Sequence, residues 1–256
     1  MNLQLHGPMG DHIVLTGIPE AYYTLFGEKV HVPHQYAHEF WMHNPYVTSQ
    51  PSMATFSVAF NAGAKDYMIY YPIRVFYDMT GHIVDRSMVQ PNLYMSREPL
   101  SGLIIVNDQA GWPSRKGYSH FDSLCDILMQ KGYQILYLRN EGYRDCVGQE
   151  SPRQIKHFHS ELRNPSIPKM IDALRSASLY IGYESGIAQL AGALKVPYIM
   201  LAGSVPPINV AHDTCIYALK LPHCKRCHAD ICGENCLRKS EGENEAILET
   251  IHEHRI

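Results

Sequence analysis

Two glycine-containing corners of the sequence place acidic residues beside a predicted helix start. The first is GPMGD, residues 7–11, where Asp11 follows the predicted strand LQLH. The second is GYESG, residues 182–186, where Glu184, Ser185 and Gly186 follow the predicted strand LYIG. The first turn of a helix has unpaired amide groups and partial positive charge, so it attracts anions. The second corner is therefore a candidate site for a ligand with phosphate and hydroxyl groups, such as a sugar nucleotide; the alternative is a capped helix without a ligand.

Asp11 has two interpretations. It can cap the helix that it begins, as aspartate commonly does. It can also act as a general base, because ligands of open α/β sheets bind outside the carboxyl ends of the strands. The motif Gly-x-Gly-x-x-Gly is absent, which argues against a nicotinamide enzyme. The order Gly-x-x-Ser-Gly is not that of a serine-hydrolase elbow, so a nucleophilic Ser185 is disfavoured.

Two cations follow the predicted strand GLIIV, residues 102–106. Arg115 and Lys116 lie in the segment NDQAGWPSRKGYSHF, which comes directly after that strand. At this edge of a sheet they can neutralise a diphosphate leaving group as its bond to a sugar breaks. The alternative is an ordinary solvated loop.

Four cysteines crowd into CKRCHADICGENC, residues 224–236. Cys224, Cys227, Cys232 and Cys236 have the spacing Cys-x2-Cys-x4-Cys-x3-Cys. Four thiolates close a tetrahedral site around zinc or iron, and a closed site is structural because no position is left for a substrate. Disulfides, an iron–sulfur cluster, or replacement of one cysteine by His223 or His228 remain alternatives. The sequence contains no Asp-x-Asp motif, which some transferases use to hold a sugar nucleotide through a divalent ion.

These residues must be positioned by alternating strands and helices, which favour a parallel α/β sheet. A helix is predicted from near Asp11 to Gly27, another from Ser119 with Asp122 as part of a capping box, a third after Pro168 and a fourth near the C-terminus. Strands are predicted at residues 3–6, 29–32, 54–60, 66–73, 102–106, 133–138, 179–182 and 198–202. Residues 93–102 are the expected linker between two halves.

Composition limits the function classes. The 256 residues are 45% hydrophobic, enough for one large or two compact globular domains. The net charge of −3 gives no overall field toward nucleic acid or anionic lipid, so neither partner is favoured. The start lacks a secretion signal and no apolar run is long enough to span a bilayer, so the expected location is the cytoplasm.

Three blocks resemble, in order, the family 9 glycosyltransferases, which include the bacterial heptosyltransferases. They are GPMGDHIVLTGIPEA, GWPSRKGYSHFDSLCDILMQKGYQILYL and ASLYIGYESGIAQLAGALKVPYIMLAGSVPP. The resemblance implies a GT-B fold: a Rossmann-like acceptor-side domain at residues 1–98 faces a nucleotide-sugar-binding domain at 99–256 across a cleft. It implies inversion at the anomeric carbon without a catalytic metal. Asp11 becomes the base, Lys116 a phosphate contact, and Glu184, Ser185 and Gly186 the donor corner.

The chain departs from the family pattern at two donor positions. Glu184 stands where the family usually has aspartate, and Gln189 stands where it usually has histidine, so the donor need not be an ADP-heptose. A cysteine cluster occurs in some heptosyltransferase-like proteins that carry iron, which supports a structural metal. The acceptor is left open between glycan, protein and another hydroxyl-bearing molecule.

Two rival functions remain. A sugar-nucleotide epimerase or hydrolase on the same fold would turn over the donor without an acceptor. A non-catalytic binding module built on the cysteine knuckle would lose partner binding without the cysteines but would be unaffected by Asp11→Ala.

Overall fold

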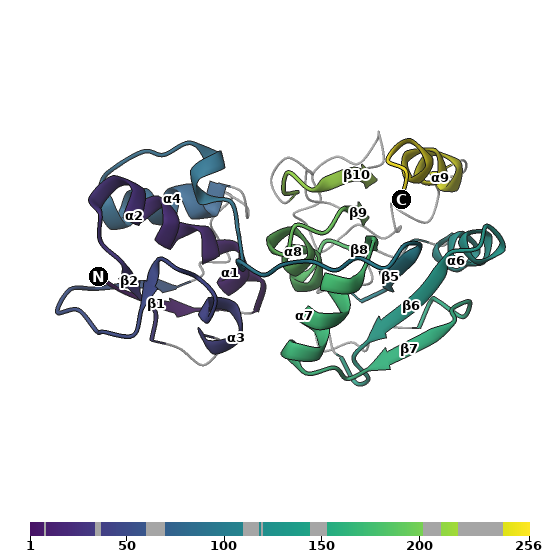
Figure 1. Cartoon of the computed structure of the whole chain (residues 1–256), viewed down its shortest axis with the longest axis horizontal. Coiled ribbons are helices and arrows are strands. Elements are labelled where there is room, and N and C mark those ends of the chain that lie inside the picture. The colour runs from purple at the N-terminus through teal and green to yellow at the C-terminus, as the bar shows by residue number, and fades with distance from the viewer. Residues whose placement is uncertain are drawn as a thin grey trace, which may run out of the picture.

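The computed structural model describes residues 1–7, 9–33, 37–59, 70–109, 118, 120–143, 153–201, 211–219 and 243–256. Its strands form two separate sheets that lie side by side (Figure 1). The first has the order β3-β2-β1-β4, and the second has the order β10-β9-β8-β5-β6-β7. Every strand pair in both sheets is parallel, which confirms the predicted parallel α/β architecture.

The first sheet belongs to the N-terminal half of the chain. Its strands are β1 (Asn2–His6), β2 (Val30–His31), β3 (Val47–Thr48) and β4 (Thr55–Ala59). Helices α1 (Met9–Val14), α2 (Ile18–Phe26), α3 (Ala37–Trp41) and α4 (Tyr70–Thr80) and the short 3-10 turns η1 (Leu15–Gly17) and η2 (Arg86–Val89) accompany it. The predicted first helix is thus interrupted by η1, and α2 ends as predicted at Gly27, whose φ of 70° suits glycine.

The second sheet belongs to the C-terminal half. Its strands are β5 (Leu103–Asn107), β6 (Gln134–Arg139), β7 (Ser160–Arg163), β8 (Leu179–Tyr183), β9 (Tyr198–Leu201) and β10 (Cys215–Leu219). Its helices are α6 (Phe121–Gln130), α7 (Ile167–Ser176), α8 (Gly186–Ala193) and α9 (Glu243–Glu253). The helical spacing of apolar residues in α6 and α7 places Phe121, Leu124, Met170 and Leu174 on inward faces, and all four side chains are buried.

One local prediction is wrong. The strand expected over residues 66–73 is a helix from Tyr70 onward, because the buried residues Val75 and Phe76 continue the segment with helical rather than alternating spacing. Ser119, the first residue of the predicted capping box, lies outside the described residues, and His120, which precedes α6, makes no side-chain cap. The carboxylate of Asp122 accepts hydrogen bonds from the amides of Lys156 and His157.

The two halves share one hydrophobic core. A single cluster of buried side chains includes Leu3 and Ile13 from the first half and Ile187 and Leu190 from the second. Between the halves, the extended chain before β5 bonds to both: the amide of Asn92 donates to Thr16 Oγ1 at 3.0 Å, and the amide of Leu93 donates to the Ala193 carbonyl at 3.1 Å. The sheets are therefore joined by packing as well as by the chain itself (Figure 1).

None of the helices in the described ranges combines the length and the apolar character needed to cross a bilayer.

Candidate active site

Asp11 lies in the first helix after β1, at the carboxyl edge of the N-terminal sheet. Its side chain is only 2% exposed. The turn before it requires glycine: Gly7 has a φ of +152°, and a Cβ there would lie 2.6 Å from Asp11 Oδ2. The GPMG sequence thus lets the backbone pass directly beside the carboxylate.

The environment of the Asp11 carboxylate disfavours its charged form. Neither of its oxygens has a hydrogen-bond partner among the described residues. Burial disfavours the charged form and raises the pKa of Asp11 to about 7. The ring of Tyr71 is close enough that the Asp11 charge, added to burial, raises the pKa of its hydroxyl. A carboxylate whose pKa lies near neutrality is well matched to removing a proton from a substrate.

The β8–α8 corner provides a helix start at the carboxyl edge of the second sheet. Ser185 caps α8 in an extended conformation, and its Oγ accepts a hydrogen bond from the Ala188 amide at 3.4 Å. Glu184, Ser185 and Gly186 are all half-buried, so a ligand can reach them. The capped helix start expected from the sequence is therefore present.

The two corners contact each other. A Cβ added to Gly10 would lie 3.4 Å from Gly186 Cα, and one added to Gly186 would lie 3.5 Å from the Gly10 amide nitrogen. The first turn of α1 therefore packs against the first turn of α8, as the two helices face each other in Figure 1. Asp11 adjoins Gly10, so the candidate base and the candidate anion site meet at the junction of the halves.

Gln189 of α8 is buried and bonded to a histidine. It is 1% exposed, and its Oε1 is hydrogen-bonded to Nε2 of His212. Burial, with the charges of Lys195 and Arg86, lowers the pKa of His212 to about 3, so the imidazole is neutral and donates this bond. Gly192 makes room for the ring, because a Cβ there would overlap the imidazole.

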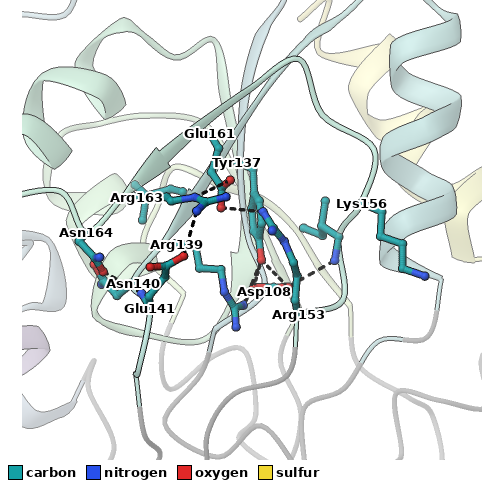
Figure 2. Close-up of polar contacts among 12 residues, drawn as sticks. Asp108, Tyr137, Arg139, Asn140, Glu141, Arg153, Lys156, Glu161, Arg163 and Asn164 are labelled. Atoms are coloured by element: carbon teal, nitrogen blue, oxygen red, sulfur yellow. Dashed lines mark hydrogen bonds and ion pairs between the residues drawn. The ribbon is translucent and has the colours of Figure 1, made fainter.

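Asp108 is a buried acid that sequence reasoning missed. It directly follows β5 and is fully buried, and its carboxylate accepts bonds from Tyr137 Oη at 2.8 Å and Arg139 Nη1 at 3.0 Å. The Gln154 amide donates a third bond at 2.7 Å. Figure 2 shows this group at the ends of β5 and β6, with Arg153 over the Tyr137 ring. The acidic residue after the apolar run GLIIV was the available sequence signal.

Several predicted site residues lie outside the described residues. They are Arg115 and Lys116, and the four cysteines Cys224, Cys227, Cys232 and Cys236. Within the described ranges, no group of three or more histidine, cysteine or acidic side chains is arranged to hold a metal ion. Asp108 directly follows the end of β5 and lies in the same segment as Arg115 and Lys116, seven positions before Arg115.

Solved structures of glycosyltransferases share the fold of this chain. The iron-containing dodecameric glycosyltransferase TibC from enterotoxigenic E. coli superposes with a TM-score of 0.74 at 16% identity, over 100% of this chain and 76% of that one. The chain has the family 9 glycosyltransferase fold. A family 9 glycosyltransferase from Veillonella parvula gives a TM-score of 0.72 at 12% identity, over 99% of this chain and 97% of that one.

A third structure extends the likeness to a nucleotide complex. The E. coli heptosyltransferase WaaC with ADP gives a TM-score of 0.65 at 12% identity, and the match covers 99% of each chain. No protein-family model matches the chain, and no curated protein matches it in sequence. The likeness therefore concerns the fold, and it agrees with the family resemblance of the three sequence blocks.

Proposed function

We propose that this protein is an inverting glycosyltransferase that moves a sugar from a nucleoside-diphosphate sugar to an acceptor hydroxyl. The observation that carries the proposal is the contact between the two corners: Gly10, next to the buried Asp11, packs against the helix start at Gly186, and neither Asp11 oxygen has a hydrogen-bond partner among the described residues. A base and an anion site at one junction are what transfer to a hydroxyl with loss of a diphosphate requires. The family 9 fold supports the same reaction, since solved neighbours include heptosyltransferases with ADP and with ADP-heptose.

The donor binds on the C-terminal half in this proposal. Its diphosphate lies at the start of α8, where the amides after Ser185 point outward, and Lys116 with Arg115 neutralises its charge. Glu184 accepts hydrogen bonds from donor hydroxyl groups. Gln189 contributes indirectly: its bond to His212 holds the inner face of α8 and so orients the corner.

The reaction is a single displacement. Asp11 accepts the proton of the acceptor hydroxyl, and the oxygen attacks the anomeric carbon from the face opposite the diphosphate. The new carbon–oxygen bond forms as the bond to the diphosphate breaks, and the nucleoside diphosphate leaves with the electron pair. The proton remains on Asp11 until it passes to solvent. No divalent ion takes part, in keeping with the absence of Asp-x-Asp.

The four cysteines near the C-terminus hold a structural metal in this proposal. Four thiolates suit zinc or iron equally, and a closed site leaves no room for substrate. TibC, the neighbour with the same fold, is described as iron-containing. The metal would stabilise the polypeptide between β10 and α9, and no step of the transfer depends on it.

A ligand screen tests the donor site. A ligand that binds only the folded protein raises the unfolding free energy by RT ln(1 + [L]/Kd), about 2.7 kcal/mol at 100 times Kd. We expect selective thermal stabilisation by one class of nucleoside diphosphate or sugar nucleotide, weakened at least tenfold in affinity by Lys116→Ala and by Glu184→Ala. Lys131→Ala is the matched control, because Lys131 is exposed and precedes β6, at the opposite edge of the sheet.

The same screen distinguishes the proposed transferase from an epimerase or hydrolase and from a non-catalytic binding module. Donor turnover that needs no acceptor would identify an epimerase or hydrolase. Folded, metal-loaded protein that responds to no nucleotide would refute the transferase proposal.

A further inference from the structure

The hydroxyl group of Tyr183 belongs to the carboxyl end of β8, one residue before the donor corner. Tyr183 is the last residue of β8 and is fully buried. Its oxygen accepts a hydrogen bond from the Tyr118 amide at 2.8 Å, and the hydroxyl donates to Gln154 Oε1 at 2.8 Å. Burial raises the pKa of Tyr183, so the hydroxyl keeps the proton that it donates. The hydroxyl therefore joins three separate parts of the chain, whereas a phenylalanine would only fill the space.

Gln154 fixes the direction of this hydroxyl. A carbonyl oxygen can only accept, so the bond to Gln154 Oε1 takes the Tyr183 proton and leaves a lone pair for the Tyr118 amide. The backbone amide of Gln154 in turn donates to Asp108 Oδ2 at 2.7 Å. Asp108, Gln154 and Tyr183 thus form a continuous hydrogen-bonded network that ends at the Tyr118 amide.

The same network holds the chain at the end of β5. Asp108 accepts hydrogen bonds from Tyr137 and Arg139 of β6 (Figure 2). The Gln109 side chain forms two further bonds, each 2.7 Å long, with the backbone of Asn140. The chain is thus attached to β6 just after β5, and it is attached again to β8 at the Tyr118 amide.

The predicted phosphate contacts lie in the sequence between these two attachments. Arg115 and Lys116 both follow β5, and Lys116 precedes Tyr118 by two residues. Two residues of chain reach at most about 7 Å. Glu184 directly follows Tyr183, so one hydroxyl ties a near neighbour of Lys116 to the start of the donor corner. A cation whose segment is held before the ligand arrives binds more tightly, because less conformational entropy is lost on binding.

We propose that Tyr183 is a positioning residue, whose hydroxyl holds the segment ending at Tyr118 beside the start of α8 so that Lys116 reaches the donor diphosphate. The role toward a diphosphate rests on the proposed transferase function, whereas the positioning of the segment does not. Tyr183 is buried and does not touch the ligand itself, so its effect on binding passes through Lys116.

Tryptophan fluorescence tests the positioning without any ligand. The chain contains two tryptophans, and Trp112 belongs to the segment between Asp108 and Tyr118. Trp41→Phe therefore leaves Trp112 as the single reporter in the full-length protein. We expect Tyr183→Phe to lower the fluorescence anisotropy of Trp112, because the Tyr118 end of the segment has lost its attachment, while the circular dichroism of the protein is unchanged.

The affinity for diphosphates tests the consequence for binding. The probes are ADP, GDP, CDP and UDP, measured by calorimetry, and the one that binds the parent protein most tightly is used for the variants. We expect Tyr183→Phe to weaken its binding about tenfold in the parent protein and less than about twofold in a Lys116→Ala background, since the effect passes through Lys116. A hydroxyl that only stabilised the fold would change the affinity by the same factor in both backgrounds.

Tyr133→Phe is the matched control. The Tyr133 hydroxyl also makes a tertiary hydrogen bond in the C-terminal half, to the Ile256 carbonyl at 3.1 Å, but Tyr133 precedes β6 at the opposite edge of the sheet. Its nucleotide affinity and Trp112 anisotropy should equal those of the parent protein. Gln154→Leu is a second variant, which keeps the Tyr183 oxygen but removes the acceptor that orients it. We expect the same changes at a smaller size, and this variant tests the inference should Tyr183→Phe fail to fold.

The outcomes are separable. Unchanged Trp112 anisotropy in Tyr183→Phe, or an equal loss of affinity with and without Lys116, would overturn the inference. If Lys116→Ala weakens nucleotide binding while Tyr183→Phe does not, the inference fails and the transferase proposal stands. If no nucleoside diphosphate binds although Tyr183→Phe lowers the anisotropy, the positioning role of Tyr183 is supported and the transferase proposal fails.

Discussion

At the scale of single residues, Asp11 is held in an environment that disfavours its charge. It is buried, and neither oxygen is hydrogen-bonded among the described residues. The glycine turn and the spacing to the helix predict the position of this acid, but they do not predict its burial, which depends on α8 packing from more than 170 residues along the chain. A long-range contact of this kind leaves no pattern in a local sequence window.

The hydrogen-bond partners of Asp108 also could not be predicted from the sequence. It follows an apolar strand in the sequence, yet its partners Tyr137, Arg139 and Gln154 are 29, 31 and 46 residues away. Only the parallel pairing of β5 with β6 brings the first two beside it. Sequence reasoning therefore finds the strand and misses the network at its end.

Asp11→Asn is expected to abolish sugar transfer. General-base catalysis contributes roughly 10²–10⁴-fold, so kcat should fall at least 100-fold, with donor affinity unchanged. With the Asp11 pKa at about 7, wild-type kcat should decline about tenfold per pH unit below pH 7, because only the ionised carboxylate accepts a proton. Steady-state assays from pH 5.5 to 8.5 measure this. A flat profile with chemistry rate-limiting would contradict the assignment, and Asp126→Asn on α6 serves as the control.

The same substitution is expected to stabilise the fold at alkaline pH. The folded-state pKa of Asp11 is raised to about 7 from 3.8, so the native state binds this proton more tightly than the unfolded state does. The bound proton makes its full contribution to the free energy of unfolding below about pH 4, and this contribution is lost as the pH rises through 7. Asp11→Asn should therefore raise the unfolding free energy by up to about 4 kcal/mol at pH 8 and by much less at pH 5. Urea unfolding at both pH values tests this, and a pH-independent difference would exclude it.

At the scale of elements, most strands and helices could be predicted because their apolar residues recur with the spacing typical of a strand or of a helix. The strand β1, the apolar β5 and the inward faces of α6 and α7 follow directly from spacing. The strands β7 and β10 were missed because they lie at the two edges of their sheet, where alternation is weak, as in the polar SELR of β7. Edge strands take their conformation from one neighbour and show little sequence signal.

The inner face of α8 offers a test of packing. A Cβ at Gly192 would overlap the ring of His212, which is buried and hydrogen-bonded to Gln189. Gly192→Ala should destabilise the protein by about 1–3 kcal/mol, as overpacking does in other cores. In a His212→Ala background the same change should cost much less, because the overlapping ring is absent. Equal losses in both backgrounds, measured by denaturant unfolding, would refute this account of α8.

At the scale of the whole molecule, the two parallel sheets match the predicted architecture and the family 9 fold. The sequence predicts the overall architecture because strands that alternate with helices along the chain are compatible with few other folds. The cysteine cluster remains a prediction, since residues 220–242 lie outside the described residues.

Metal analysis tests the cluster. Protein purified without chelator is expected to contain about one equivalent of zinc or of iron, and Cys224→Ser or Cys232→Ser should reduce that content and lower the thermal midpoint. Cys125→Ser is the control, because Cys125 is a buried free thiol of α6. Metal content unchanged in the cluster variants would exclude these cysteines as ligands.

The contact between α1 and α8 also affects folding during synthesis, because the hydrophobic core spans both halves of the chain. Domains commonly fold as they leave the ribosome, N-terminal first. Here Ile187 and Leu190 of α8, which belong to the same hydrophobic cluster as α1 and β1, are translated only after about three-quarters of the chain. Apolar surface of the first sheet therefore stays exposed to solvent until the second half of the chain has been translated. We therefore expect the nascent N-terminal half to be more prone to aggregation than the finished chain.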